Sequence, residues 1–226
     1  MGEHVQIPKP EPDEAALEKR REHLININMY TLTQVRAEML KKGFRFFEDN
    51  ANKGYDVNIV GIRNKATGKK VTNIFDDLIT TSYKDEKGEW QYKEWAATTD
   101  PGKKSMLEWR AMGITGGCAR LVPGQYRSTY ATDLHQGKYE ALCQRLANVD
   151  VYRDTDLDLE YDENKVTNGM YGINIHKAGR DSTWVENWSA GCQVFKRVKD
   201  FEEFMAIIRK AKKIHGNKFS YTLLEM

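Results

Sequence analysis

Apolar and polar residues alternate along most of the chain with the period of β-strands. Runs of strand length are separated by turn residues, for example at 64–68 and 85–88, and this spacing is typical of antiparallel strands joined in a meander. The predicted strands cover, in chain order, residues 56–63, 70–83, 89–99, 149–162, 172–176 and 219–224. The pattern therefore indicates a protein built mainly from β-sheet.

Three segments have the apolar spacing of helices instead. A charged helix is predicted over 15–25, and a second between Thr33, its expected N-cap, and Gly43. The third covers 200–214, where Asp200 followed by Glu203 resembles a capping box. The apolar positions of the second and third helices are Val35, Met39, Leu40, Phe201, Phe204, Met205 and Ile208.

These elements predict a mixed, β-rich α+β fold, in which an antiparallel β-sheet forms a sandwich or barrel with peripheral helices. Residues 1–50 are predicted to form an N-terminal extension with helices, and residues 1–13 carry three prolines that favour an extended lead-in. Residues 51–226 are predicted to form one domain that ends with a helix and a strand. A chain of 226 residues is long enough for one substantial core of this kind.

Composition and charge narrow the class of protein. The chain is 40% hydrophobic and 30% charged, with a net charge of +2, so no strong field points to nucleic acid as a partner. No apolar stretch approaches the roughly 18 residues of a membrane span, and the first residues lack the apolar core of a secretion signal. We therefore expect synthesis in the cytoplasm, without a signal peptide or a membrane span. The sequence gives no indication of the oligomeric state.

The cysteines do not form a metal or disulfide pattern. Cys118, Cys143 and Cys192 make no CxxC pair, so neither a disulfide framework nor a thiolate zinc site is predicted. A zinc site made of Cys192, His176 and His135 would lack the paired spacing of a metal peptidase. We expect no metal and no cofactor.

An acidic stretch raises the alternative of a calcium loop. Leu159 stands where the turn glycine of such a loop belongs, and Lys165 stands in place of the closing glutamate. Alternate acidic residues on the solvent face of a strand explain the stretch better. The residues concerned are Asp154, Asp156, Asp158 and Glu160.

Cysteine and histidine side chains suitable for acyl transfer occur close together in the sequence. His176 ends a short apolar strand, and Cys192 begins the next apolar run after a loop. A strand, a loop of this length and a returning strand would bring His176 to the Cys192 sulfur, and a base there would favour a thiolate of low pKa. A buried, inert cysteine beside a structural histidine is the alternative.

The residues before Cys192 are predicted to support this chemistry. Gly191 permits a tight turn, and the backbone N–H groups of residues 191–193 are natural donors to an oxyanion. Ser189 is placed either to bind the loop backbone or to orient a ligand.

His176 followed by Ser189-x-Gly191-Cys192 resembles the active-site signature of the L,D-transpeptidase (YkuD-like) catalytic domain. Several further stretches resemble a group of uncharacterised phage and bacterial proteins distantly related to that domain: NIVGIR, ATTDPG, PGQY, VYRD, GINIH, WSAGCQVF and YTLL. The resemblance covers roughly residues 55–195. The chain departs from the family at Ala190, where a histidine is usual, and at Val194, where an arginine or asparagine is usual.

The resemblance implies a β-rich L,D-transpeptidase-type domain in which the cysteine attacks a peptide stem of peptidoglycan and the histidine acts as base. With Ala190 and Val194 the loop has fewer groups to hold a second peptide, so hydrolysis, as a peptidase or carboxypeptidase, is expected rather than cross-linking. The likeness to phage proteins implies release to the cell wall by lysis. Two alternatives remain, a catalytically inactive cell-wall-binding module and a phage structural or assembly protein with a structural cysteine.

Four further residues are predicted to bind substrate. Trp184 and Trp188 flank the expected cleft and can stack on a sugar or peptide, although packing of the loop also explains them. Arg180 is the nearest candidate for a carboxylate clamp, and His135 is a candidate for the lining of the same cleft. A solvated arginine and a structural histidine are the corresponding alternatives.

Overall fold

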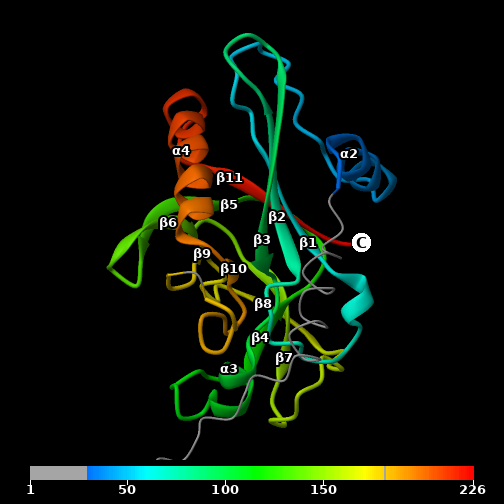
Figure 1. The fold of residues 1–226 in the computed structure, drawn as a ribbon, viewed down its shortest axis with the longest axis vertical. Coiled ribbons are helices and arrows are strands. Elements are labelled where there is room, and N and C mark those ends of the chain that lie inside the picture. The colour runs from blue at the N-terminus through cyan, green and yellow to red at the C-terminus, as the bar shows by residue number, and fades with distance from the viewer. Residues whose placement is uncertain (1–29, 181) are drawn as a thin grey trace, which may run out of the picture.

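In the computed structural model, which describes residues 30–180 and 182–226, eight strands close a barrel and three others form a separate sheet. The barrel order is β1-β11-β5-β6-β9-β10-β3-β2, and the small sheet, in the order β4-β7-β8, lies below it in Figure 1. The prediction of a β-rich α+β fold is confirmed.

The helical elements are α2 (Leu32–Lys41), η1 (Lys65–Thr67, a 3-10 turn), α3 (Lys103–Glu108) and α4 (Val198–His215). The strands are β1 (Asn58–Arg63), β2 (Asp77–Lys84), β3 (Trp90–Thr98), β4 (Cys118–Leu121), β5 (Gly124–His135), β6 (Tyr139–Gln144), β7 (Val149–Asp154), β8 (Val166–Gly169), β9 (Ile175–Lys177), β10 (Gln193–Phe195) and β11 (Phe219–Glu225).

Two pairs of barrel strands are parallel, and the predicted antiparallel meander includes neither pairing. β1 pairs with β11, and β9 pairs with β10 so that Val194 lies opposite His176. Parallel neighbours require a connection that crosses from the end of one strand back to the start of the next. The loop between β9 and β10 is therefore a crossover, whereas the sequence predicted a strand that simply returns.

Helix α4 packs its predicted apolar face against the barrel. Phe201, Phe204, Met205 and Ile208 are almost completely buried, and they join the core that fills the barrel. The predicted start is wrong, because the N-cap is Arg197. Glu203 accepts a hydrogen bond from Trp95 Nε1 at 3.0 Å instead of closing a capping box.

Helix α2 covers another part of the barrel surface. Its N-cap is Thr31 rather than the predicted Thr33, since Thr31 and Gln34 form the capping box. Val35 and Met39 are buried against side chains of β1, β2 and β11, whereas Leu40 is exposed. The described part of the predicted N-terminal extension thus packs on the barrel, and the helix predicted over 15–25 lies outside the described residues.

Two predicted strands are shorter than expected. β2 begins at Asp77 rather than residue 70, and β7 ends at Asp154. Residues 155–165 form a loop, which is held to the chain before β2 by the bridge of Lys70 with Glu160 and by the bond from Tyr161 N–H to Lys69 O. The predicted alternation of acidic residues on a strand's solvent face is therefore wrong, because only Asp154 of that set belongs to a strand and it is buried.

A buried ion pair connects the barrel to the small sheet. Arg63, at the end of β1, is 2% exposed, and its Nε lies 2.7 Å from Asp100 Oδ1. The same guanidinium donates to Leu121 O in β4 and to Thr99 O, both at 3.0 Å. Arg63 thereby fixes three chain segments at one point.

No helix among residues 30–180 and 182–226 has the length and apolar character needed to cross a membrane.

Candidate active site

The parallel pairing of β9 and β10 decides how Cys192 and His176 lie. Gln193 N–H donates to Asn174 O at 2.9 Å, and Val194 is level with His176. Side chains of one strand alternate between the two faces, so Cys192 and His176 project from the same face of neighbouring strands. They are offset by two positions along the strands, about 7 Å at 3.3 Å per residue. The described contacts include no hydrogen bond between them.

His176 is buried and held in one tautomer. Its Nδ1 lies 2.9 Å from Lys177 O, an acceptor, so Nδ1 carries the proton and Nε2 keeps its lone pair. The Tyr139 hydroxyl lies 3.4 Å from the same Nδ1. Burial, reinforced by the neighbouring His135, lowers the pKa of His176 to about 3. The imidazole is therefore neutral across the ordinary pH range.

His135 stacks directly on His176. The ring centroids are 4.1 Å apart with an interplanar angle of 21°, and His135 is also buried. Asn174 holds it, since Asn174 Oδ1 accepts from Gln144 N–H and its Nδ2 lies 3.1 Å from His135 Nδ1. In the neutral ring the proton is then on Nε2. His135 lies beside the candidate base, and its contacts are those of a residue that supports His176.

Cys192 is partly exposed, but its thiol is enclosed. Sγ donates to Gly172 O at 3.5 Å. Burial raises the pKa of Cys192 to about 11; Cys143 adds to this, and the N–H of Asn174 opposes it. The expectation of a thiolate of low pKa is therefore wrong for the resting protein, which carries a neutral thiol beside a neutral imidazole.

The turn before Cys192 is fixed by its own polar groups. Ser189 Oγ donates to Cys192 O at 2.8 Å and accepts from Gly191 N–H at 3.2 Å. This is the backbone-binding alternative of the two predicted for Ser189, which is completely buried. The turn is also bound to its surroundings, since Gly102 N–H donates to Ser189 O and Ala119 N–H to Ala190 O.

Gly191 is required at its position by geometry. Its φ is 132°, and a Cβ there would lie 2.5 Å from Ala119 O. The predicted oxyanion donors are mostly used within the turn, because Gly191 N–H bonds Ser189 and Gln193 N–H bonds Asn174. Of the three, the N–H of Cys192 is the one with no acceptor among the described residues.

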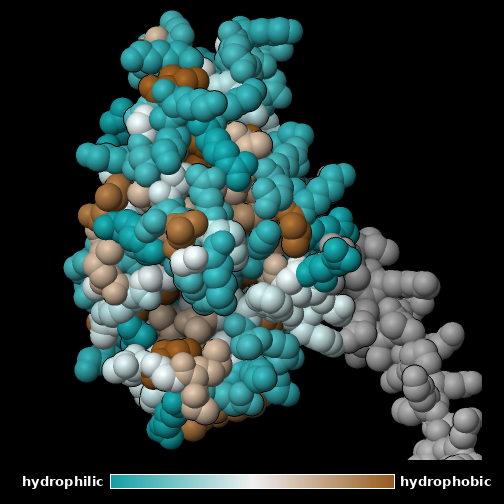
Figure 2. Space-filling view, turned by 90° about the vertical axis from the view of Figure 1, so that its left-hand side faces the viewer, coloured by the Kyte–Doolittle hydropathy of each residue, from teal (hydrophilic) through white to brown (hydrophobic). Residues whose placement is uncertain are grey.

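The remaining predicted residues belong to the crossover loop. Trp184 and Trp188 are 39% and 42% exposed, and the ring of Trp188 covers Gly179. Arg180 is exposed. Among the described residues, no hydrogen bond, ion pair or ring contact joins the side chains of Arg180 and Trp188 to Cys192 or His176. The side of the molecule that carries α4 and this loop is shown in Figure 2, where apolar side chains gather around a hollow in the lower half.

Three residues near the site were missed by sequence reasoning: Tyr139, Asn174 and Gly172. Asn174 had a weak signal, because it alternates with the buried Ile173 and Ile175 on the face that also carries His176. Tyr139 had none, since it reaches His176 from β6, a strand that the sequence pattern did not predict.

Comparisons with known proteins find no relative of this chain: no family model matches, and no match is found among curated proteins or solved structures. The resemblance to the L,D-transpeptidase domain therefore stays a prediction.

Alkylation should distinguish the three thiols. We expect iodoacetamide to modify Cys192 before Cys118 and Cys143. Those two residues are buried, whereas Cys192 is partly exposed, and its enclosed thiol reaches the reagent once it rotates away from Gly172 O. The pKa of Cys192 near 11 leaves little thiolate at neutral pH, so its rate should rise about tenfold per pH unit between about pH 7 and 10. Mass spectrometry of peptides after timed labelling measures both. A rate for Cys192 that is already maximal at pH 7 would contradict the raised pKa.

Proposed function

We propose that the chain is an L,D-transpeptidase-like cysteine enzyme that hydrolyses stem peptides of peptidoglycan. The observation that carries the chemistry is the placement of Cys192 and a neutral His176, with a free Nε2 lone pair, on one face of two adjacent strands. The substrate class rests on the sequence resemblance. Access to the wall on phage lysis is part of the same proposal.

The proposed mechanism is general-base catalysis by a neutral pair. Because a pKa of about 3 makes His176 a weak base in the resting protein, the mechanism requires substrate binding to raise that pKa as the thiol approaches. On substrate binding the thiol turns from Gly172 O toward His176 Nε2, since catalytic contacts often tighten only in the complex. The S–H proton passes to Nε2 while Sγ bonds to the carbonyl carbon, whose π electrons move to oxygen. Collapse breaks the C–N bond, and His176 returns the proton to the leaving amine. Water then attacks the thioester carbon while His176 takes its proton. Collapse breaks the C–S bond and releases the carboxylic acid, and His176 returns the proton to Sγ, which restores the thiol.

Hydrolysis is proposed over transfer because two positions, Ala190 in the turn and Val194 in β10, offer no polar group to a second peptide. Val194 is completely buried with Phe75, Ala178 and Val185. Ala190 packs against the cluster of Met106 and Cys118. Transfer requires an amine held in register, whereas water needs no such positioning.

A second candidate is an inactive cell-wall-binding module on the same fold. The observation that favours it is the enclosed, protonated thiol of Cys192, which hydrogen-bonds to Gly172 O. A structural cysteine in a phage assembly protein would have the same properties, and binding to purified sacculi separates these two.

Incubation with purified disaccharide-tetrapeptide and disaccharide-pentapeptide tests the proposal. We expect mass spectrometry to detect loss of residues from the stem, and Cys192→Ala to abolish that loss. Cys143→Ala is the matched control, because it removes a buried thiol that bonds Asp133 O instead. Cross-linked dimers would show transfer in place of hydrolysis. Unchanged muropeptides together with retention on sacculi would favour the binding module.

A further inference from the structure

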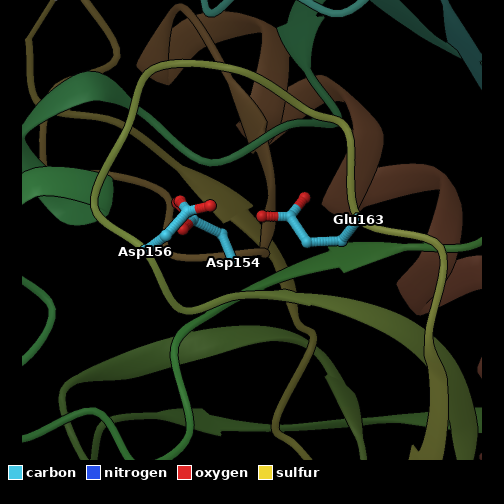
Figure 3. A group of neighbouring side chains, drawn as sticks. All are labelled: Asp154, Asp156 and Glu163. Atoms are coloured by element: carbon cyan, nitrogen blue, oxygen red, sulfur yellow. The ribbon is translucent and has the colours of Figure 1, made fainter.

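Three carboxylates converge at the end of β7, a strand of the small sheet that carries neither Cys192 nor His176. Asp154, Asp156 and Glu163 each place a carboxylate oxygen within 4.8 Å of the others. Figure 3 shows the side chains of Asp154 and Asp156 on one side and that of Glu163 on the other, with their oxygens directed toward one another. Asp158 and Asp162 form a second such group with Asp156, so the loop concentrates negative charge here.

Asp154 is the residue that distinguishes this group from an ordinary acidic surface. It is 4% exposed, and neither of its carboxylate oxygens has a hydrogen-bond partner within the described chain. The N–H of Leu157 approaches and lowers the pKa of Asp154, but without the geometry of a hydrogen bond. Oε1 of Glu163 is likewise buried without a partner. Isolated buried carboxylates are strongly unfavourable unless a positive charge compensates them.

The nearby arginine does not supply that charge. Arg153 donates to Gly117 O, and its guanidinium lies over the Tyr171 ring at 4.2 Å from the centroid. Burial, with the repulsion of Glu163 next, raises the pKa of Asp154 to about 7, and Glu163 also has a raised pKa, mainly through burial. By comparison, the buried Asp100 is paired with two arginines.

We propose that Asp154, Asp156 and Glu163 bind a Ca²⁺ ion. The donor set consists of carboxylate oxygens, which suit a hard cation rather than zinc or copper. Ca²⁺ accepts six to eight oxygens in flexible geometry, including bidentate carboxylates and water, whereas Mg²⁺ needs a near-ideal octahedron. Ligands that come partly from a long loop fit Ca²⁺ better. The spacing differs from that of an EF-hand loop. Glu163 supplies the closing carboxylate, which an EF-hand loop would carry at the position of Lys165.

The ion would stabilise the chain beneath the Cys192 turn. Asp154 lies opposite Cys118 in the pairing of β7 with β4, and the next residue of β4, Ala119, donates to Ala190 O. Loss of the ion should therefore loosen β4 and the loop that rests on it. This site goes beyond the proposed function and does not depend on it.

Calorimetric titration of the full chain with CaCl₂, after treatment with a chelator, tests the proposal. We expect saturable binding together with a rise in Tm. Asp154→Asn and Glu163→Gln should each weaken binding by about tenfold or more, since each removes a charged ligand. Glu160→Gln is the matched control, because Glu160 lies in the same loop outside both carboxylate groups, and it should bind Ca²⁺ like the wild type.

Asp154→Asn should also fold without Ca²⁺ at least as stably as the ion-free wild type, because it removes an uncompensated buried charge. If it fails to fold, the partly exposed Glu163→Gln still reports on the site. Absence of saturable binding at millimolar CaCl₂ would overturn the proposal. Equal Ca²⁺ affinity in the wild type and in both variants would also overturn the proposal, because the ion would then bind the exposed aspartates of the loop. An equal rise in Tm with MgCl₂ would overturn the choice of Ca²⁺.

Discussion

His176→Gln is expected to lower kcat/KM on the muropeptide substrate by about 10²–10⁴-fold, the usual contribution of a general base. Glutamine keeps an N–H donor for Lys177 O, the acceptor that His176 Nδ1 uses, but it has no lone pair of comparable basicity. The fold should therefore survive while proton transfer is lost. His215→Gln is the matched control, because His215 bonds Gly54 O away from the β9–β10 pair, and it should retain wild-type kcat/KM.

The pH profile provides an independent readout of the same pair. Because the pKa of His176 is about 3 and that of Cys192 about 11, both groups stay neutral over the measurable range. We expect kcat/KM to be nearly flat from about pH 5 to pH 9, and to fall only when His176 gains a proton in strong acid. A bell-shaped profile with a limb between about pH 6 and 8 would indicate a thiolate–imidazolium pair and would contradict the neutral mechanism.

Arg63→Leu is expected to reduce the free energy of unfolding by about 3–5 kcal/mol, which is typical when one partner of a buried ion pair is removed. Leucine leaves Asp100 without its 2.7 Å partner and leaves Leu121 O and Thr99 O without their donors. Asp77 lies beside Asp100, and burial together with that neighbour already raises the pKa of Asp77 to about 7. Removing Arg63 would therefore leave a group of buried carboxylates with less compensation.

Urea denaturation of the wild type, Arg63→Leu and Arg209→Leu measures this effect. Arg209 also forms a 2.7 Å ion pair, with Glu140, but both side chains are more than a third exposed. A solvent-screened pair contributes about 0–1 kcal/mol, so Arg209→Leu should change stability little. Similar losses in the two variants would show that burial of Arg63 has no special role.

Sequence reasoning succeeded where the signal is local. The apolar periodicity around Phe201 and Phe204 predicted the buried face of α4, and the strands at 56–63, 89–99 and 219–224 were found to within a few residues. It failed at caps where two candidates compete. Thr33 and Thr31 are both suitable residues, but only Thr31 has Gln34 three positions later to complete the capping box.

Pairing between distant strands could not be predicted from the pattern of apolar and polar residues. Nothing in the local sequence around His176 and Cys192 distinguishes a parallel pair from a hairpin, yet that choice displaces the two side chains along the strands. The stack of His135 on His176 likewise joins β5 to β9. Glu163 was missed for a related reason, because the loop from β7 folds back and brings it to Asp154 outside any recognised spacing.

The position of β11 has a consequence for biosynthesis. In the closed barrel β11 lies between β1 and β5 and hydrogen-bonds to both (Figure 1). A nascent chain on the ribosome therefore presents two unpaired strand edges until residues 219–225 have emerged, and such edges are templates for intermolecular pairing. Contacts between residues as distant as Ile59 and Tyr221 also raise the contact order and slow folding. Closure of the barrel thus waits for residues 219–225, and the interval before it is the period of greatest exposure to aggregation.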